Sequence, residues 1–300
     1  MDIQQLNTEY GIADQLEFIK GKGGMPFIVI RNQSATALIS LHGGQILSFK
    51  PLNEENDLLF LSSQSDYIDG KAIRGGMPVC WPWFGPDPKG LQRPNHGFVR
   101  NHCWSVARTA AADNETKVFL QFFEDYKKEK TWRQPFALTL EVTVGKSLRL
   151  KLITRNTGDK AFSITQAFHS YFLVGDINQV QVSGLEGYDY YDKLDQGTQK
   201  TQTGILTIAE EIDRIYTEVK NELIVNDPSL QRRIQIASPG NETVVVWNPW
   251  QKASEKMADL KNDSYQQFIC VETGNIAFDL VQVLPDEEVC LETHFNIVRD

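Results

Sequence analysis

The stretch that decides the fold is ALTLEVTV, residues 137–144. Its apolar side chains recur at every second position, at Leu138, Leu140, Val142 and Val144. This period of two predicts a β-strand that turns one face toward the protein core. The following run LRLKL, residues 148–152, has the same period, and Gly145-Lys146-Ser147 between the two runs favours a hairpin turn. The sequence therefore predicts an antiparallel hairpin near its middle.

Short strand-like runs also occur on both sides of this hairpin. They cover residues 26–31, 117–122, 161–168, 244–247, 268–272, 277–283 and 288–295. Turn residues separate them, and many short strands with few helical periods indicate an all-β sandwich or barrel. The one extended helical spacing lies in residues 3–20, so residues 1–22 are interpreted as an N-terminal extension with helical character. Since no repeat or linker interrupts the chain, we expect a single domain over residues 1–300.

Composition excludes several classes of protein. The 300 residues carry a formal net charge of −9, which argues against a general nucleic-acid binder and against adhesion to anionic membranes. Hydrophobic residues make up 41% and charged residues 23%, as in a soluble globular protein. The four cysteines lie far apart without a CxxC pair, which favours reduced thiols over a zinc site. The sequence has neither a signal-peptide pattern nor a long apolar run, so we expect a cytoplasmic protein with no membrane partner.

A Pro-rich and Gly-rich segment, residues 74–104, breaks the strand pattern and holds 5 of the 12 prolines. So long a loop is usually functional in a compact domain. Arg74 opens it before the pair Gly75-Gly76, and His96 and Arg100 lie further along. Arginine offers a planar fork of donors for phosphate or carboxylate, although an ordinary surface salt bridge is the alternative. The segment contains no nucleotide-binding glycine motif.

Two further positions, His169 and Glu272, are candidates for a functional site. In ITQAFHSYF, residues 164–172, a period of two puts Thr165, Ala167, His169 and Tyr171 on one strand face. Glu272 ends the apolar run FICVE, and it is either a surface residue at a turn or a buried functional carboxylate. Four tryptophans cluster in WPW (81–83) and WNPW (247–250), where they either line a sugar site or pack in the core.

Taken together, these segments resemble the glucose-6-phosphate 1-epimerase (hexose-6-phosphate mutarotase) branch of the aldose 1-epimerase family. The matching segments are IRGGMPVCWPWFGP, NHGFVRNHCW, TRNTG, AFHSYF, EIDRIY, VVVWNPW and CVETGN. They follow the family's order over roughly residues 40–295, nearly the whole chain. The resemblance implies a galactose-mutarotase-like antiparallel β-supersandwich with few short helices, which agrees with the strand pattern.

The resemblance also implies roles for seven residues. His169 matches the family's catalytic acid, and Glu272 matches its catalytic base. The substrate-binding positions match Arg74, Asn95, His96, Arg100 and Asp213. Relatives often carry Gln where this chain has Asn95, a shorter amide. The match of Asp192 to a binding position is less certain.

These residue types suit anomer interconversion. Opening a cyclic hemiacetal requires a base that takes the C1 hydroxyl proton and an acid that protonates the ring oxygen. Glu272 and an imidazolium at His169 provide the two groups, and no cofactor or metal is needed. We therefore expect a small-molecule phosphosugar substrate and a monomeric protein. The alternatives are a mutarotase of unphosphorylated aldoses, a glycosidase with two carboxylates, and a non-catalytic sugar-binding protein.

Overall fold

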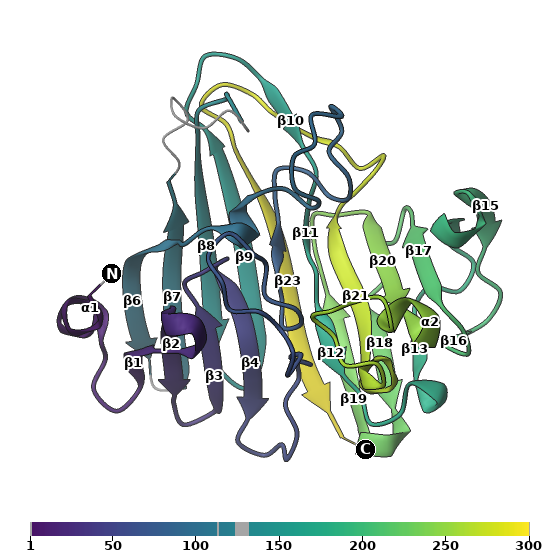
Figure 1. Cartoon of the computed structure of the whole chain (residues 1–300), viewed down its shortest axis with the longest axis horizontal. Coiled ribbons are helices and arrows are strands. Elements are labelled where there is room, and N and C mark those ends of the chain that lie inside the picture. The colour runs from purple at the N-terminus through teal and green to yellow at the C-terminus, as the bar shows by residue number, and fades with distance from the viewer. Residues whose placement is uncertain (1, 113, 124–131, 300) are drawn as a thin grey trace.

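The structure is a computed structural model that describes residues 2–112, 114–123 and 132–299 (Figure 1). The hairpin expected at its centre is present, because strand β8 (Phe136–Val144) pairs with β9 (Leu148–Asn156) in antiparallel register. The Gly145 N–H donates to the Ser147 carbonyl at 3.0 Å and closes the turn. Buried and partly exposed residues alternate along β9, as the period of two predicts.

This hairpin belongs to a nine-stranded antiparallel sheet within the described residues. Its remaining strands are, from one edge to the other, β16 (Leu206–Thr207), β13 (Gln181–Ser183), β18 (Leu223–Asp227), β19 (Arg232–Ala237), β23 (Glu288–Val298) and, beyond β9 and β8, β7 (Glu115–Phe122) and β6 (Ser105–Ala112). The sheet forms the back layer in Figure 1.

Two further sheets lie in front of this layer (Figure 1). The eight-stranded sheet runs through β15 (Thr198–Thr201), β14 (Asp189–Asp192), β17 (Ile212–Tyr216), β20 (Thr243–Asn248), β21 (Phe268–Asn275), β11 (Gln166–Phe168) and β5 (Val79–Cys80), with β12 (Tyr171–Leu173) also paired to β21. The four-stranded sheet consists of β1 (Leu16–Lys20), β2 (Pro26–Arg31), β3 (Ala35–Ser40) and β4 (Gln45–Pro51). Apolar side chains from all three sheets form one core cluster that runs from Leu6 to Phe295.

Helices are few and short, as expected. The described residues contain two α-helices, α1 (Ile3–Tyr10) and α2 (Trp250–Ser254). Short 3₁₀ turns are η1 (Lys22–Gly24), η2 (Val99–Asn101), η3 (Ile177–Gln179), η4 (Lys193–Asp195), η5 (Pro228–Leu230) and η6 (Ser264–Gln267). The small remaining sheet pairs β10 (Phe162–Ile164) with β22 (Val281–Val283).

Two expectations from the sequence need correction. The helical spacing over residues 3–20 is wrong for its second half, because α1 ends at Tyr10 and Leu16–Lys20 forms strand β1. Pairing with β2 and burial of Leu16 and Phe18 at a period of two stabilise the strand there. The strand expected at 277–283 is only β22, since Ala277 has a φ of 54°, outside the strand region.

A close approach between β11 and β21 brings the candidate residues together. Ala167 lies opposite Gly274 in this pairing, and a Cβ added at Gly274 would lie 2.3 Å from the Gln166 carbonyl oxygen. Only glycine fits such a contact without moving one of the strands. The segment directly after β11, which carries His169, is thereby held beside the middle of β21.

Candidate active site

Glu272 projects from the middle of β21, in which all eight residues are buried. It is paired with Val245 of β20, and its side chain is only 2% exposed. Strand β21 is buried on both faces. One face packs against the core, and the face that carries Glu272 contacts a cluster of polar side chains. Of the two interpretations left open by the sequence, the buried carboxylate is therefore right.

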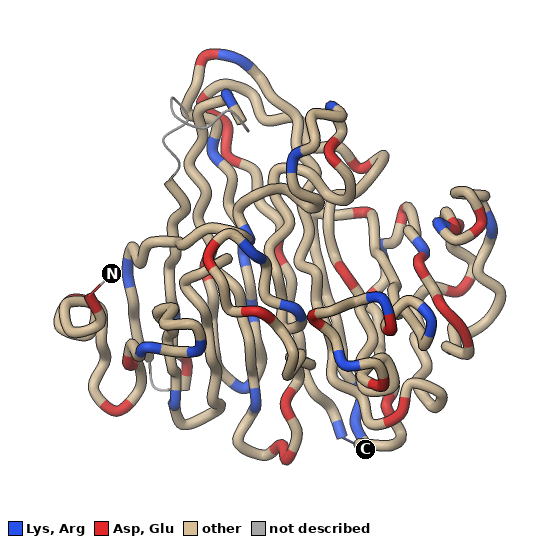
Figure 2. The backbone as a smooth tube through the Cα atoms, in the orientation of Figure 1, with Lys and Arg blue, Asp and Glu red and all other residues tan. Residues whose placement is uncertain are grey.

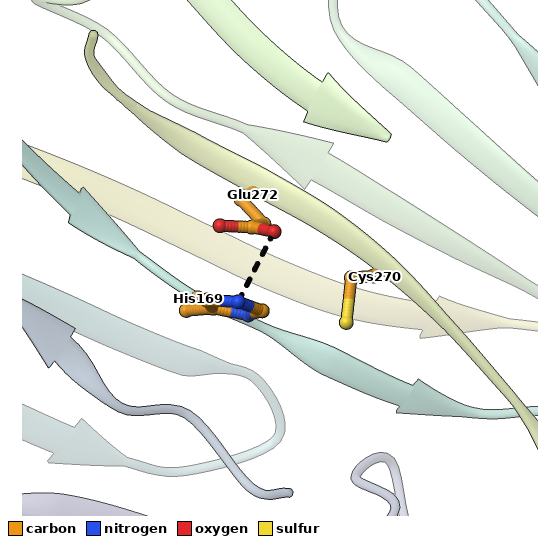
Figure 3. A group of neighbouring side chains, drawn as sticks. All are labelled: His169, Cys270 and Glu272. Carbon is orange, nitrogen blue, oxygen red and sulfur yellow. Dashed lines mark ion pairs between the residues drawn. The ribbon is translucent and has the colours of Figure 1, made fainter. Parts of the chain in front are cut away.

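His169 lies directly across from this carboxylate (Figure 3). Its Nε2 atom is 3.4 Å from Oε1 of Glu272, and its main-chain N–H donates to the Pro78 carbonyl. Tyr171 stacks on the imidazole with ring centroids 4.8 Å apart, as the shared strand face predicts. Pro78 and Tyr171 thus fix the imidazole in front of Glu272.

Burial shifts the pKa values of these two groups in opposite directions. Desolvation, followed by the charges of His96, Arg100 and Arg74, lowers the pKa of His169 well below its ordinary value. Desolvation, followed by the negative charge of Asp213, raises the pKa of Glu272 well above its ordinary value. Burial thus disfavours the charged form of each group, which favours a neutral imidazole at His169 and a protonated carboxyl at Glu272 in the free protein.

Each member of the pair also has a buried polar atom without a partner. Nδ1 of His169 and Oε2 of Glu272 are buried, and neither makes a hydrogen bond. Buried polar atoms are rarely left unsatisfied without a functional reason. The two atoms are free to bind a ligand.

The His96 ring packs edge-on against the His169 ring, with the centroids 5.5 Å apart. Its Nδ1 accepts a hydrogen bond from the Gly85 N–H at 3.3 Å, which leaves Nε2 as a donor in the neutral tautomer. Burial, with the charges of Arg100, Lys193 and Arg74, lowers the pKa of His96 to about 3. His96 is thus a neutral hydrogen-bond donor at neutral pH.

The two candidate arginines line one cavity of about 350 Å³ that also includes Pro78 and Tyr171. Arg74 donates from Nε to Asp259 and from Nη1 to the Tyr171 hydroxyl, each at 3.0 Å. Arg100 donates from Nη2 to the Asn95 carbonyl at 3.0 Å, and its buried Nε has no partner. Across residues 2–112, 114–123 and 132–299, no carboxylate forms an ion pair with Arg100. Within the cavity Arg74 is paired with Asp259 and Lys71 with Asp66, so Arg100 carries the positive charge that no carboxylate neutralises.

The remaining candidate positions differ in how they relate to this cluster. Asp213 of β17 is close enough to Glu272 to raise its pKa, and it binds Nζ of Lys193 at 2.9 Å. Asn95 has an exposed side chain, and its carbonyl holds Arg100. Asp192 caps η4 and pairs with Lys200, so it has a local structural role.

Three neighbouring residues escaped the sequence reasoning: Lys193, Asp259 and Cys270. The period of two places Cys270 on the face of Glu272, so a signal for it was present. Asp259 is separated from Arg74 by 185 residues, and no local pattern links them.

The tryptophan clusters divide between core and site. Trp81 is fully buried and Trp83 is 3% exposed, so both pack in the core. Trp247 packs edge-on against His169 with centroids 6.1 Å apart. All four cysteines are free, as expected: Cys80 and Cys270 are buried, and Cys103 and Cys290 are exposed.

Charges elsewhere are mixed in sign. Figure 2 shows basic and acidic residues interspersed over both halves of the molecule. The positive charge in the arginine cavity is therefore a local feature of a chain whose net charge is −9. None of the helices in the described residues is long and apolar enough to cross a membrane.

Known proteins share both the sequence and the fold. Proteins from Salmonella typhimurium and Escherichia coli, each named as a candidate glucose-6-phosphate 1-epimerase, are 36% identical to this chain, and each match covers 83% of both chains. A candidate glucose-6-phosphate 1-epimerase from Cenchrus ciliaris is also 36% identical, over 87% of this chain and 81% of its own.

The structural comparison agrees. The crystal structure of a candidate mutarotase, YeaD, from Salmonella typhimurium superposes with a TM-score of 0.90 at 32% identity, over 97% of this chain and 96% of that one. A galactose mutarotase-like protein from Clostridium acetobutylicum shares the fold at a TM-score of 0.70 and 13% identity, over 95% of this chain and 98% of its own. The aldose 1-epimerase family model matches residues 26–296. The predicted fold class is confirmed, and the chain belongs to the aldose 1-epimerase family.

Proposed function

We propose that this protein interconverts the α and β anomers of a hexose 6-phosphate, most directly glucose 6-phosphate. The observation that carries the proposal is the buried His169–Glu272 pair, 3.4 Å apart, next to a cavity lined by Arg74 and Arg100. The names of the relatives support the choice of a phosphorylated aldose.

In the proposed mechanism, the anomeric centre of the sugar lies against the His169–Glu272 pair. Glu272, as carboxylate, takes the proton of the C1 hydroxyl while the bond between C1 and the ring oxygen breaks. His169, as imidazolium, gives its proton to the ring oxygen, and the open-chain aldehyde forms. Rotation about the C1–C2 bond presents the other face of the aldehyde, and the two proton transfers then run in reverse. Because burial favours the proton on Glu272 in the free protein, the proposed cycle begins with its transfer from Glu272 to His169 when the sugar binds.

The two arginines bind the phosphate in this proposal. Arg74 is fixed by Asp259 and Tyr171, which orients its guanidinium before a ligand arrives. Arg100 has a buried Nε without a partner, and a phosphate oxygen is a suitable acceptor for it. Because the overall charge is −9, this local charge has to overcome a repulsive field for an anionic substrate.

His96 and Asp213 bind sugar hydroxyls in the same arrangement. Neutral His96 donates from Nε2, and Asp213 accepts once the hydroxyl competes with Lys193. Asn95 contributes by holding Arg100 through its carbonyl. A monomeric state, a cytoplasmic location and a single domain stay predictions.

The test is anomer exchange followed by NMR for glucose 6-phosphate, galactose 6-phosphate and free glucose, with and without the protein. We expect acceleration for the phosphorylated sugars and a smaller effect on glucose. Equal acceleration of phosphorylated and free glucose would replace the proposal by a mutarotase of unphosphorylated aldoses. Release of the aglycone from a chromogenic glycoside, without anomer exchange, would overturn both.

A further inference from the structure

A third side chain lies beside the His169–Glu272 pair and has no place in the proposed mechanism. Cys270 precedes Glu272 by two residues on β21, so both side chains leave the strand on the same side (Figure 3). One ligand atom from each of Cys270, His169 and Glu272 lies within 4.8 Å of the other two. Across residues 2–112, 114–123 and 132–299, this is the one such group of histidine, cysteine and acidic residues.

The separations suit a tetrahedral metal ion. Zinc–nitrogen and zinc–oxygen bonds of about 2.1 Å at a tetrahedral angle place the two ligand atoms about 3.4 Å apart. Nε2 of His169 and Oε1 of Glu272 are 3.4 Å apart. A zinc–sulfur bond of about 2.3 Å places the sulfur about 3.6 Å from the nitrogen. Sγ of Cys270 and a ring nitrogen of His169 lie within 4.8 Å of each other, so side-chain rotation has to shorten that separation by no more than about 1.2 Å.

The donor types and charges also suit zinc. Imidazole nitrogen, thiolate sulfur and carboxylate oxygen are the usual zinc ligands in proteins. A thiolate at Cys270 and a carboxylate at Glu272 together neutralise a divalent cation. Both residues are at most 2% exposed, and a neutral assembly avoids the desolvation cost of an unpaired buried charge.

We propose that Zn²⁺ binds to His169 Nε2, Cys270 Sγ and a Glu272 carboxylate oxygen, and thereby inhibits the enzyme. The ion gives up water ligands, and the protein releases the Cys270 thiol proton and the Glu272 carboxyl proton to the solvent. Three protein ligands leave the fourth position of the ion open.

Inhibition follows from the loss of both proton-transfer groups. A metal on Nε2 and on the carboxylate occupies the electron pairs that would take up protons. The inhibition rests on the proposed function, whereas the binding of metal does not. Because the ion occupies the place of the anomeric centre, inhibition should be competitive with the sugar.

Metal binding is tested without sugar by adding Co²⁺ to the chelator-treated protein. Co²⁺ bound to a thiolate gives a strong near-ultraviolet charge-transfer band. We expect this band in the wild type and in Cys290→Ser, a matched control at an exposed cysteine of β23, and its loss in Cys270→Ser. Should Cys270→Ser fail to fold, as judged by circular dichroism, Cys270→Ala replaces it. No thiolate band in the wild type, or a band retained without Cys270, would overturn the site.

Inhibition is tested by anomer exchange at increasing Zn²⁺, with the rate without protein subtracted at each concentration and Mg²⁺ as the control ion. Zn²⁺ should inhibit the wild type, and a chelator should restore its activity. Loss of a ligand should raise the inhibition constant of Cys270→Ser at least about 10-fold, while Cys290→Ser matches the wild type. Equal inhibition constants in Cys270→Ser and the wild type would refute the inhibitory role. If no aldose is converted, the proposed function fails, and the cobalt measurement still decides the site.

Discussion

Two ion pairs of nearly equal length lie in the two large sheets. In the nine-stranded sheet, Lys117 of β7 and Glu141 of β8 are 3.5 Å apart, with side chains 41% and 25% exposed. At the eight-stranded sheet, His169 and Glu272 are 3.4 Å apart, with side chains 10% and 2% exposed. The separations differ by 0.1 Å, and the exposure to solvent differs several-fold.

The difference in solvent exposure, rather than the separation of the charged atoms, therefore sets the role of each ion pair. Water screens the exposed pair, and such pairs contribute about 0–1 kcal/mol to stability. The buried pair lacks that screening, and burial disfavours the charged form of each group. One sheet carries an ordinary surface contact, and the other carries a group able to move protons.

The largest effect should come from breaking the buried pair. Glu272→Gln and His169→Asn should each lower kcat by at least about 10², because each removes one proton-transfer group. Glu141→Gln, the matched change in the exposed pair, should leave kcat unchanged. Anomer exchange at saturating substrate measures this, with circular dichroism to verify folding. A wild-type kcat in either site variant would contradict the assigned roles.

The second prediction tests the stability that the nine-stranded sheet provides. Leu140 of β8 is fully buried, and Leu140→Ala should reduce the free energy of unfolding by about 2–5 kcal/mol through lost burial and a residual cavity. Urea denaturation measures the loss, and the KM of the folded variant should stay at the wild-type value. If Leu140→Ala changed the KM and left the free energy of unfolding unchanged, the nine-stranded sheet would contribute to substrate binding rather than to stability.

The third prediction concerns charge near the buried pair. Arg74→Ala and Arg100→Ala should raise the KM for glucose 6-phosphate by about 10- to 150-fold, the value of a charge-assisted phosphate contact of about 1.5–3 kcal/mol. Free glucose should be affected several-fold less. Arg31→Ala, which removes an exposed ion pair with Glu17, is the matched control and should change neither value. The same factor for both sugars would place the phosphate elsewhere.

The smallest effect is a pH dependence of stability at His96. Its pKa falls from 6.5 to about 3 on folding, so between these values the unfolded state binds more protons than the folded state. The free energy of unfolding therefore rises with pH between about pH 3 and pH 6.5. Above pH 6.5 His96 is neutral in both states, so folding no longer has to remove a proton from it. His96→Asn should raise the Tm relative to the wild type at pH 5 by about 2–4 °C and have little effect of this kind at pH 7.5. Calorimetry at both pH values checks it, and a difference independent of pH would contradict the burial of His96.

Much of the fold could be predicted because its signal is local. The hairpin at residues 137–152 alternates residue by residue, and the strand at 26–31 has the bounds expected from its apolar run. Residues 16–20 were harder, since a five-residue edge strand next to a short helix offers too few positions to separate a period of two from a helical period. The paired glycines at 75 and 76 do adopt positive φ values, 96° and 62°, as glycine allows.

The site shows the limit of such reasoning. The motifs identified His169, Glu272, Arg74 and Arg100 as candidates, and the period of two placed Tyr171 on the face of His169. Nothing local could connect Arg74 with Asp259, which lies 185 residues away, or assign Lys193 to Asp213. These contacts depend on which strands become neighbours in the folded chain.

The all-β class and the central hairpin follow from local sequence, because side-chain direction alternates along a strand whatever surrounds it. The resemblance to the aldose 1-epimerase family named His169 and Glu272 as the acid and the base. Only the folded chain shows that β21 is buried on both faces, that Gly274 lets β11 approach it, and that His169 and Glu272 lie 3.4 Å apart. The physical reason is desolvation: the pKa of a side chain is set by what excludes water from it, and here those groups come from strands distant in sequence.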